Sequence, residues 1–215
     1  MGRITDTVKA LIIVNVLFYM GSMYTGEVAY KLFSLYYFES PNFHFWQPLT
    51  HMFMHDSQSI MHILFNMFGL YMFGTPIEQM WGRKTFIFFY LSTGIGAAAF
   101  QLLLYYFQVN QVSNILLAEG LTVSQISTFF QTGDLSYSMV ERIGREKLLS
   151  GLSTFNSVMV GASGALYGIL VAFAFLFPNA RLMLLFPPIP VKAKILVPIL
   201  ILSDLFFGFT SYSIG

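Results

Sequence analysis

Five apolar stretches divide the chain, and each is long enough to cross, or nearly cross, a lipid bilayer. They cover residues 8–24, 60–75, 85–107, 160–177 and 191–209. A helix that spans the hydrocarbon core needs about 20 predominantly apolar residues. The second and fourth stretches are shorter and contain polar residues, so we expect them inside a helical bundle rather than against lipid. The pattern predicts an all-α polytopic membrane protein with five spans in a single domain, residues 1–215.

The composition agrees with a membrane protein. Of the 215 residues, 56% are hydrophobic and 10% are charged, whereas soluble domains carry about 25% charged residues. The absence of cysteine excludes disulfides and thiolate chemistry. A formal net charge of +1 provides no basic field for nucleic acid, so we expect no nucleic-acid partner. No clear signal-peptide cleavage site follows the first apolar stretch, and we interpret that stretch as a retained anchor.

Basic residues are distributed unevenly between the two sides that these spans define. Seven of the eleven fall on one side: Arg3, Lys9, Arg83, Lys84, Arg181, Lys192 and Lys194. Because cytoplasmic segments carry an excess of Lys and Arg, we predict a cytoplasmic N-terminus. Residues 25–59, the loop 108–159 and the C-terminus then lie outside, and we expect 108–159 to be a solvated loop with one or two short helices. We expect a bacterial plasma membrane, because no organelle-targeting segment is visible.

Polar side chains gather at the start of the second span. All four histidines fall between residues 44 and 62, and Asn66 follows. His62 and Asn66 are four residues apart and therefore share one face of a helix. Polar side chains in a membrane helix are costly unless they face a partner or a water-filled cavity. Hydrogen bonding between helices is the simplest explanation for the pair.

A metal site is an alternative explanation for the same histidines. His51 and His55 are four residues apart, and together with His62 and Asp56 they could ligate zinc. The H-E-x-x-H signature is absent, and the run DSQS argues against one continuous helix through these residues. We therefore predict no metal centre and no cofactor.

Ser163 lies in the segment VGASGALYGIL, at the start of the fourth span. Gly164 and Gly168 have the G-x-x-x-G spacing that lets two helices approach closely, so close packing is the simpler explanation for the small residues. The alternative is a nucleophile. Ser163 lies near a helix N-terminus, where free N–H groups and the helix dipole favour an anion. His62 and Asn66 begin their span on the same outer side, so both could donate hydrogen bonds to a developing oxyanion.

Three segments with recognisable motifs follow one another along the chain: FWQPLTHMFMH, MHILFNMFGLYMFGTPIEQMWGRKTFIFFYLSTGIGA and GASGALYG. The second contains an H-x-x-x-N motif, and the third contains a G-x-S-G motif. With these segments in this order and with this topology, the chain resembles the rhomboid family of intramembrane serine proteases over nearly its whole length.

The resemblance implies a rhomboid-like helical bundle with a role for each of five polar residues. Ser163 would be the nucleophile, and His62, Asn66 and the Ser163 backbone N–H would form the oxyanion hole. Tyr167 would pack beside the catalytic imidazole, and His51 would help to hold water near the site. The expected partners are the lipid bilayer and transmembrane protein substrates, which the enzyme would cleave near the outer face.

Further positions match the family or depart from it. Glycines at 161 and 164 would let a substrate backbone approach Ser163 closely. Glu78 and Gly82 resemble the family's structural E-x-x-x-G turn. Gln47 stands where an arginine is often found in the family.

The general base is the main departure, because in the family it is a histidine from a sixth span. No histidine follows His62, and Asp204, the single acid of the fifth stretch, is more simply explained as a polar contact at a helix end. The end at Gly215 resembles a truncation that leaves five of six spans. We therefore predict that this chain is inactive or nearly so, and that the base-bearing helix would dock against Gly164 and Gly168.

The alternative function is a non-catalytic rhomboid-like protein that binds transmembrane helices. Such relatives lose the serine or the histidine of the dyad. The retention of Ser163, His62 and Asn66 favours the enzyme.

Overall fold

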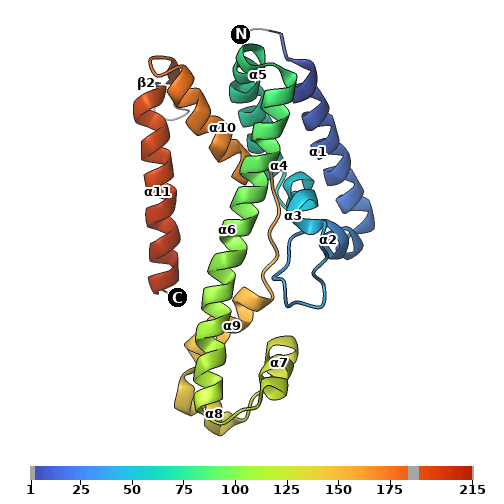
Figure 1. Ribbon diagram of the computed structural model, residues 1–215, viewed down its shortest axis with the longest axis vertical. Helices are drawn as coiled ribbons and strands as arrows, with labels where there is room; N and C mark the ends of the chain where they lie inside the picture. Colours follow the sequence, from blue (N-terminus) through green and yellow to red (C-terminus); the bar gives the residue numbers. More distant parts are fainter. Residues whose placement is uncertain (1–2, 184–188, 215) are drawn as a thin grey trace.

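The computed structural model describes residues 3–183 and 189–214, with side chains for 3–183 and 189–203. Helices form nearly all of its regular structure (Figure 1). Within the described part, three helices are long and apolar enough to cross a membrane: Asp6–Thr25, Ile60–Trp81 and Arg83–Ala118. Ser163–Leu176 and Ala193–Ser203 are shorter apolar helices. The protein is therefore an integral membrane protein, and the count of five spans stays a prediction.

The first half of the chain builds three of the predicted spans. They are α1 (Asp6–Thr25), a continuous helix made of α4 (Ile60–Gly69), η2 (Leu70–Gly74) and α5 (Thr75–Trp81), and the first part of α6 (Arg83–Ala118). The segment η2 is a single π-helical turn, a local widening that occurs within α-helices. Gly82, with φ +77°, makes the sharp turn between α5 and α6.

Short helices fill the connection between α1 and α4: α2 (Glu27–Phe33), α3 (Gln47–Thr50) and η1 (His51–Phe53). Gln47 holds this connection together, because its buried amide group donates to the carbonyls of Lys31 and Asn42 at 3.0 and 2.8 Å. Its Oε1 also accepts a hydrogen bond from the Tyr36 backbone at 3.4 Å. Gln47 therefore provides hydrogen-bond partners for three backbone groups of this irregular segment.

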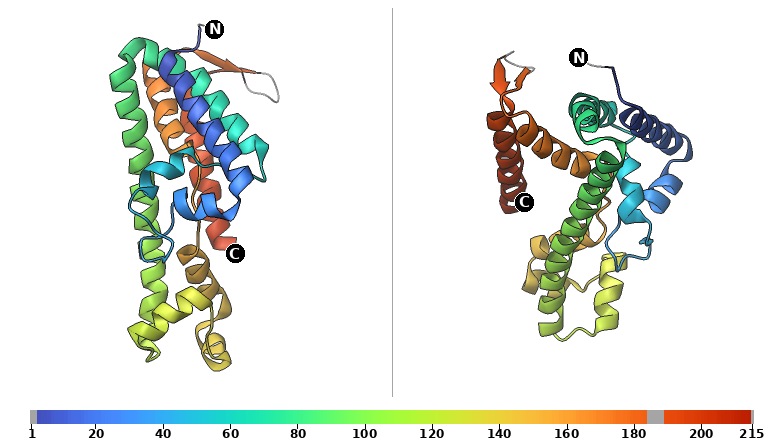
Figure 2. Two further views of the ribbon diagram at one scale, coloured as in Figure 1. Left: turned by 90° about the vertical axis from the view of Figure 1, so that its right-hand side faces the viewer. Right: turned by 45° about the horizontal axis from the view of Figure 1, so that its top comes forward.

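Residues 108–159 differ from the loop that we expected. The helix α6 continues to Ala118, and α7 (Val123–Thr132), α8 (Tyr137–Ile143) and α9 (Arg145–Phe155) follow. Thr122 and Gln125 form a reciprocal capping box at the start of α7. These helices enclose an apolar core that contains Val112, Leu116, Phe129, Phe130 and Phe155. The segment is therefore a small helical module, which the views in Figure 2 place at one end of the molecule.

The last part of the chain consists of α10 (Ser163–Leu176), a hairpin and α11 (Ala193–Ile214). The hairpin pairs β1 (Arg181–Met183) antiparallel with β2 (Pro190–Lys192). The hairpin, the start of α1 and the α5–α6 turn lie at the same end of the molecule (Figures 1 and 2). The fold thus brings together the segments that the charge pattern assigns to one side of the membrane.

Glu78 fastens α5 to the start of α1. Its carboxylate accepts hydrogen bonds from the Thr5 hydroxyl and from the backbone N–H groups of Thr7 and Val8, at 3.2 and 3.0 Å respectively. The first N–H groups of a helix have no partner within the helix. A buried carboxylate from another element therefore replaces a local N-cap, because Thr5 makes no side-chain cap hydrogen bond.

We expect Glu78→Ala to destabilise the protein, because it leaves buried N–H groups of α1 without an acceptor, at a cost of about 1–3 kcal/mol for each. Thermal unfolding in detergent measures the loss. Glu27→Ala is the matched control, because Glu27 is also in the first turn of a helix but its side chain is 89% exposed. Equal unfolding temperatures for the two variants would contradict the capping role.

Close contact with α6 fixes the position of α10. An added Cβ on Gly164 would lie 2.6 Å from Cβ of Ala97, and one on Gly168 would lie 2.6 Å from Cγ2 of Thr93. These glycines allow the approach that the G-x-x-x-G spacing predicts. The neighbour they meet is α6, however, and not the base-bearing helix that we expected there. The difference arises because small-residue spacing marks a contact face without identifying the partner helix.

We expect Gly168→Ala to lower stability by about 1–3 kcal/mol, because the new methyl group overlaps the β-branched side chain of Thr93. Gly96→Ala in α6 is the control, since nothing lies within 4 Å of a Cβ at that position. This control should be neutral or stabilise by up to about 1 kcal/mol, as Gly→Ala does in a helix. Chemical or thermal unfolding in detergent distinguishes the two, and a neutral Gly168→Ala would contradict close packing.

Candidate active site

Ser163 is the first residue of α10, and an unusual backbone precedes it. Gly161 has φ +118°, a conformation that side-chain-bearing residues rarely adopt, and its N–H donates to the carbonyl of His51 at 3.0 Å. Two residues earlier, Leu35 and Met159 exchange backbone hydrogen bonds of 3.0 and 2.9 Å. The connection between α1 and α4 thus holds the approach to Ser163 at two points.

The space at Gly161 is shared by the two side chains of greatest interest. A Cβ built on this glycine would lie 3.0 Å from Nε2 of His62 and 3.7 Å from Oγ of Ser163. The H-x-x-x-N segment and the G-x-S-G segment, about 100 residues apart in sequence, therefore meet at this point, as the motif interpretation requires. A side chain at position 161 would occupy the space between the two groups.

The His62 imidazole is oriented so that it can donate a hydrogen bond toward this space. Its Nδ1 accepts a hydrogen bond from the backbone N–H of Asp56 at 3.4 Å. In a neutral imidazole one ring nitrogen accepts and the other carries the proton. The hydrogen bond therefore assigns the proton to Nε2, the atom that faces Gly161.

Asn66 and the start of α10 add further donors. The buried amide group of Asn66 donates to the carbonyl of His62 at 2.7 Å, one turn earlier in α4, which leaves its second N–H hydrogen available. Ala162, in the N-cap position of α10, has no side chain that could accept from the first N–H groups of the helix. The N–H groups of a helix start that lacks such a cap are suited to bind an anion.

The comparison with protein families gives a match over most of the chain. The model of the Rhomboid domain matches residues 42–214, which include every residue of the candidate site. This chain belongs to the rhomboid family. No curated protein matches it in a sequence search. Within the rhomboid domain, the described side chains contain no group of three or more His, Cys, Asp or Glu residues arranged to hold a metal ion.

Two buried histidines lie behind the candidate site of this rhomboid domain. His51 donates from Nδ1 to the carbonyl of Gln47 at 3.0 Å, and burial lowers its pKa. The ring of His55 packs edge-on against that of His62, with ring centroids 5.2 Å apart. Burial and the neighbouring His62 lower the pKa of His55 to about 4. Both rings are therefore neutral at pH 7 and add no charge beside His62.

The structure leaves two sequence predictions open and adds two main-chain contacts that the sequence did not predict. Tyr167 is 37% exposed and stacks on no imidazole among the rings the structure describes, so its packing role stays a prediction. The side chain of Asp204 lies outside the described residues. Sequence analysis missed the backbone N–H of Asp56, which orients His62, and the carbonyl of His51, which holds Gly161. Both are main-chain groups, and their contacts cannot be predicted from the pattern of side chains.

The low pKa of His55 predicts a pH-dependent stability. Folding favours the neutral ring, whereas the unfolded chain binds a proton near the ordinary pKa of 6.5, so stability falls as the pH decreases from 6.5 toward about 4. We expect the unfolding temperature to be lower at pH 5 than at pH 7, and the difference to shrink in His55→Gln. His51 accounts for part of the remainder, since its pKa is shifted in the same direction. An unchanged pH dependence in His55→Gln would contradict this origin, and His44→Gln is the control.

Proposed function

We propose that this rhomboid-family protein is an intramembrane serine endopeptidase with Ser163 as its nucleophile. The observation that carries the proposal is the position of Ser163 Oγ and His62 Nε2 around the same space at Gly161. A nucleophile at an uncapped helix start, with a side-chain donor opposite, is the arrangement needed for acyl transfer. Its substrates are transmembrane proteins, and their scissile segment must be extended to reach that space.

The reaction proceeds through an acyl-enzyme. Ser163 Oγ attacks the scissile carbonyl carbon, and the negative charge that develops on its oxygen is stabilised by Nε2–H of His62, by Asn66 and by the Ser163 backbone N–H. The Ser163 hydroxyl gives its proton to an acceptor as it attacks, and the same proton passes to the leaving amine when the peptide C–N bond breaks. Water hydrolyses the ester and regenerates Ser163. Because His55 is neutral, it places no positive charge beside the His62 imidazole.

No proton acceptor for Ser163 is found among the side chains that the structure describes, residues 3–183 and 189–203. In the part of the chain with described side chains, Ser163 Oγ forms no hydrogen bond. The four histidines lie at 44, 51, 55 and 62, all before α10. Loss of one member of a catalytic triad leaves only weak catalysis. We therefore propose that the 215-residue polypeptide by itself cleaves substrates very slowly or not at all.

Charge and geometry together support one orientation in the membrane. We propose five spans, formed by α1, the helix from α4 to α5, the first part of α6, α10 and α11. The end with the N-terminus and the hairpin faces the cytoplasm, because the basic residues of that side gather there. Ser163, at the opposite end of α10, then faces the outer side. Water reaches it from that side, where irregular backbone at membrane depth is tolerated beside a polar cavity.

A fluorophosphonate probe tests the nucleophile, with added imidazole to serve as a proton acceptor. We expect imidazole to accelerate labelling of the protein in nanodiscs, and Ser163→Ala to abolish it. His62→Ala should slow labelling by about 10²-fold, as the loss of one oxyanion donor does.

Two controls complete this experiment. Ser157→Ala removes a nearby hydroxyl that bonds only to a helix carbonyl, and His44→Ala removes a histidine that stacks on Trp46. Both should be labelled like the wild type. Labelling that does not depend on Ser163 would contradict the protease. It would favour the second candidate, a rhomboid-like protein that binds transmembrane helices. The lack of a hydrogen bond at Ser163 Oγ among the described side chains is also consistent with that function.

A further inference from the structure

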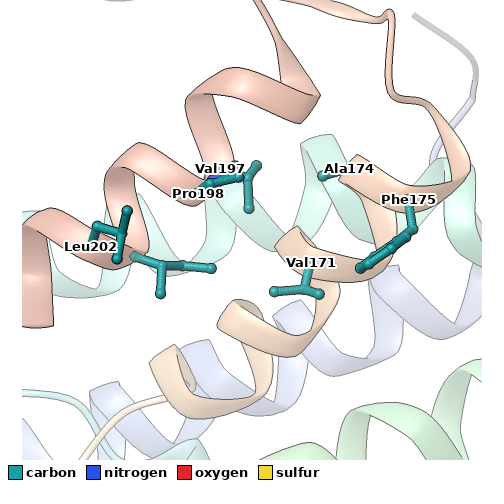
Figure 3. A pocket seen from close by; sticks show the side chains of 7 residues that line it. Val171, Ala174, Phe175, Val197, Pro198 and Leu202 are labelled. Atoms are coloured by element: carbon teal, nitrogen blue, oxygen red, sulfur yellow. The ribbon is translucent and has the colours of Figure 1, made fainter.

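An apolar groove separates α10 from α11. One cavity of about 320 Å³ lies between them, and its lining includes Val171, Ala174, Phe175, Val197, Pro198 and Leu202. Figure 3 shows these side chains on the two helices on either side of the space. A second cavity of about 240 Å³ shares Ala174, Phe175 and Pro198 with the first and ends at Pro178 and Lys194. The two form one continuous groove that begins beside the hairpin.

The groove is apolar along its length and has a cation at one end. Phe175 and Leu202 are 82% and 65% exposed, so neither is covered by the described protein. Pro198, in the second turn of α11, has no N–H to present. Lys194 stands at the hairpin end, where α11 begins. Such a lining suits a hydrocarbon chain joined to an anionic group.

The hairpin adds two more cations at the same end. Arg181 and Lys192 are directly opposite each other in the β1–β2 register. Like charges in opposed cross-strand positions destabilise a two-stranded ribbon. The two ion pairs among the described side chains are Lys31–Glu27 and Arg142–Glu119, so no described acid neutralises the hairpin cations.

The hairpin also carries exposed apolar side chains beside these charges. Met183 and Ile189 are 67% and 51% exposed. Exposed apolar residues next to Lys and Arg are typical of a segment that lies in the headgroup region. The basic end of the groove is therefore at the depth of lipid phosphates.

We propose that this groove binds an anionic phospholipid from the leaflet on the hairpin side. Its phosphate lies among Arg181, Lys192 and Lys194, and one acyl chain follows the groove toward Leu202. The dimensions agree, because the eight-residue rise from Lys194 to Leu202 is about 12 Å, and one leaflet contributes about 15 Å of hydrocarbon. The lipid supplies the counter-charge that the hairpin lacks and fills the space between α10 and α11. This site is separate from Ser163, and the proposal does not depend on catalysis.

Photo-crosslinking in nanodiscs tests the site. The probe is phosphatidylglycerol with a diazirine on one acyl chain, and peptide mass spectrometry locates the adducts. We expect adducts in residues 171–175 and 197–202, and at least about fivefold fewer with the phosphatidylcholine analogue, since each basic residue near an anionic surface contributes roughly a fivefold preference. Equal labelling by the two lipids would overturn the proposal.

Matched variants separate headgroup recognition from simple exposure to lipid. Lys192→Gln with Lys194→Gln should reduce the phosphatidylglycerol adducts to the phosphatidylcholine level. Lys31→Gln with Lys147→Gln removes the same charge elsewhere and should leave them unchanged. Leu202→Trp should reduce labelling by filling the groove, whereas Ile199→Trp, at an exposed position of α11 that does not line the groove, should not. Equal effects of the paired variants would overturn the proposal.

A protein occupant gives a different result. Because the chain contains no cysteine, Leu202→Cys introduces a single thiol into the groove. A thiol crosslink to a second copy or to another helix, in place of lipid adducts, would overturn lipid binding and identify that occupant.

Discussion

The hydrogen bond from the Gly161 N–H to the His51 carbonyl is the contact on which the arrangement around Ser163 depends. Irregular backbone at membrane depth persists only where protein or trapped water satisfies it. The connection between α1 and α4 provides this, because η1 supplies the carbonyl of His51 and the segment after α2 supplies Leu35, which pairs with Met159. Gln47 in turn holds that connection through three backbone groups. The backbone that leads into Ser163 is therefore held by residues that precede it by more than 100 positions.

The polar groups near Ser163 orient one another through successive contacts. The Asp56 N–H donates to Nδ1 of His62, and this places the ring proton on Nε2, toward Gly161. His55 packs against the same ring and is kept neutral by burial. A charged His55 would repel any positive charge on His62 and would require its own counter-ion in a buried place. Because His55 is neutral, the direction in which His62 donates depends on a single contact, the hydrogen bond from the Asp56 backbone N–H.

Much of this fold could be predicted from the sequence, because apolar length and motif order are local properties. The three long apolar helices follow from apolar length, and the meeting of His62 with Ser163 at Gly161 follows from the motifs. The module after residue 107 could not be predicted in the same way. Its polar run from Gln108 to Asn114 is typical of a loop, but Val109, Val112 and Leu116 in the same helix face an apolar core built by α7 and α9. The partner of Gly164 and Gly168 was also missed, because spacing predicts a contact face without its neighbour.

The helix α10 is tightly packed on the side that faces α6 and loosely packed on the side that faces α11. Toward α6, glycines bring the backbones so close that a methyl group has no room. Toward α11, the side chains border an open groove, and Pro198 interrupts the hydrogen bonding of the facing helix. Displacement of α10 relative to α6 would require repacking of a dense contact, whereas α10 and α11 face each other across an open groove. The contact with α6 therefore fixes the helix that begins with Ser163, and the groove on its other side does not.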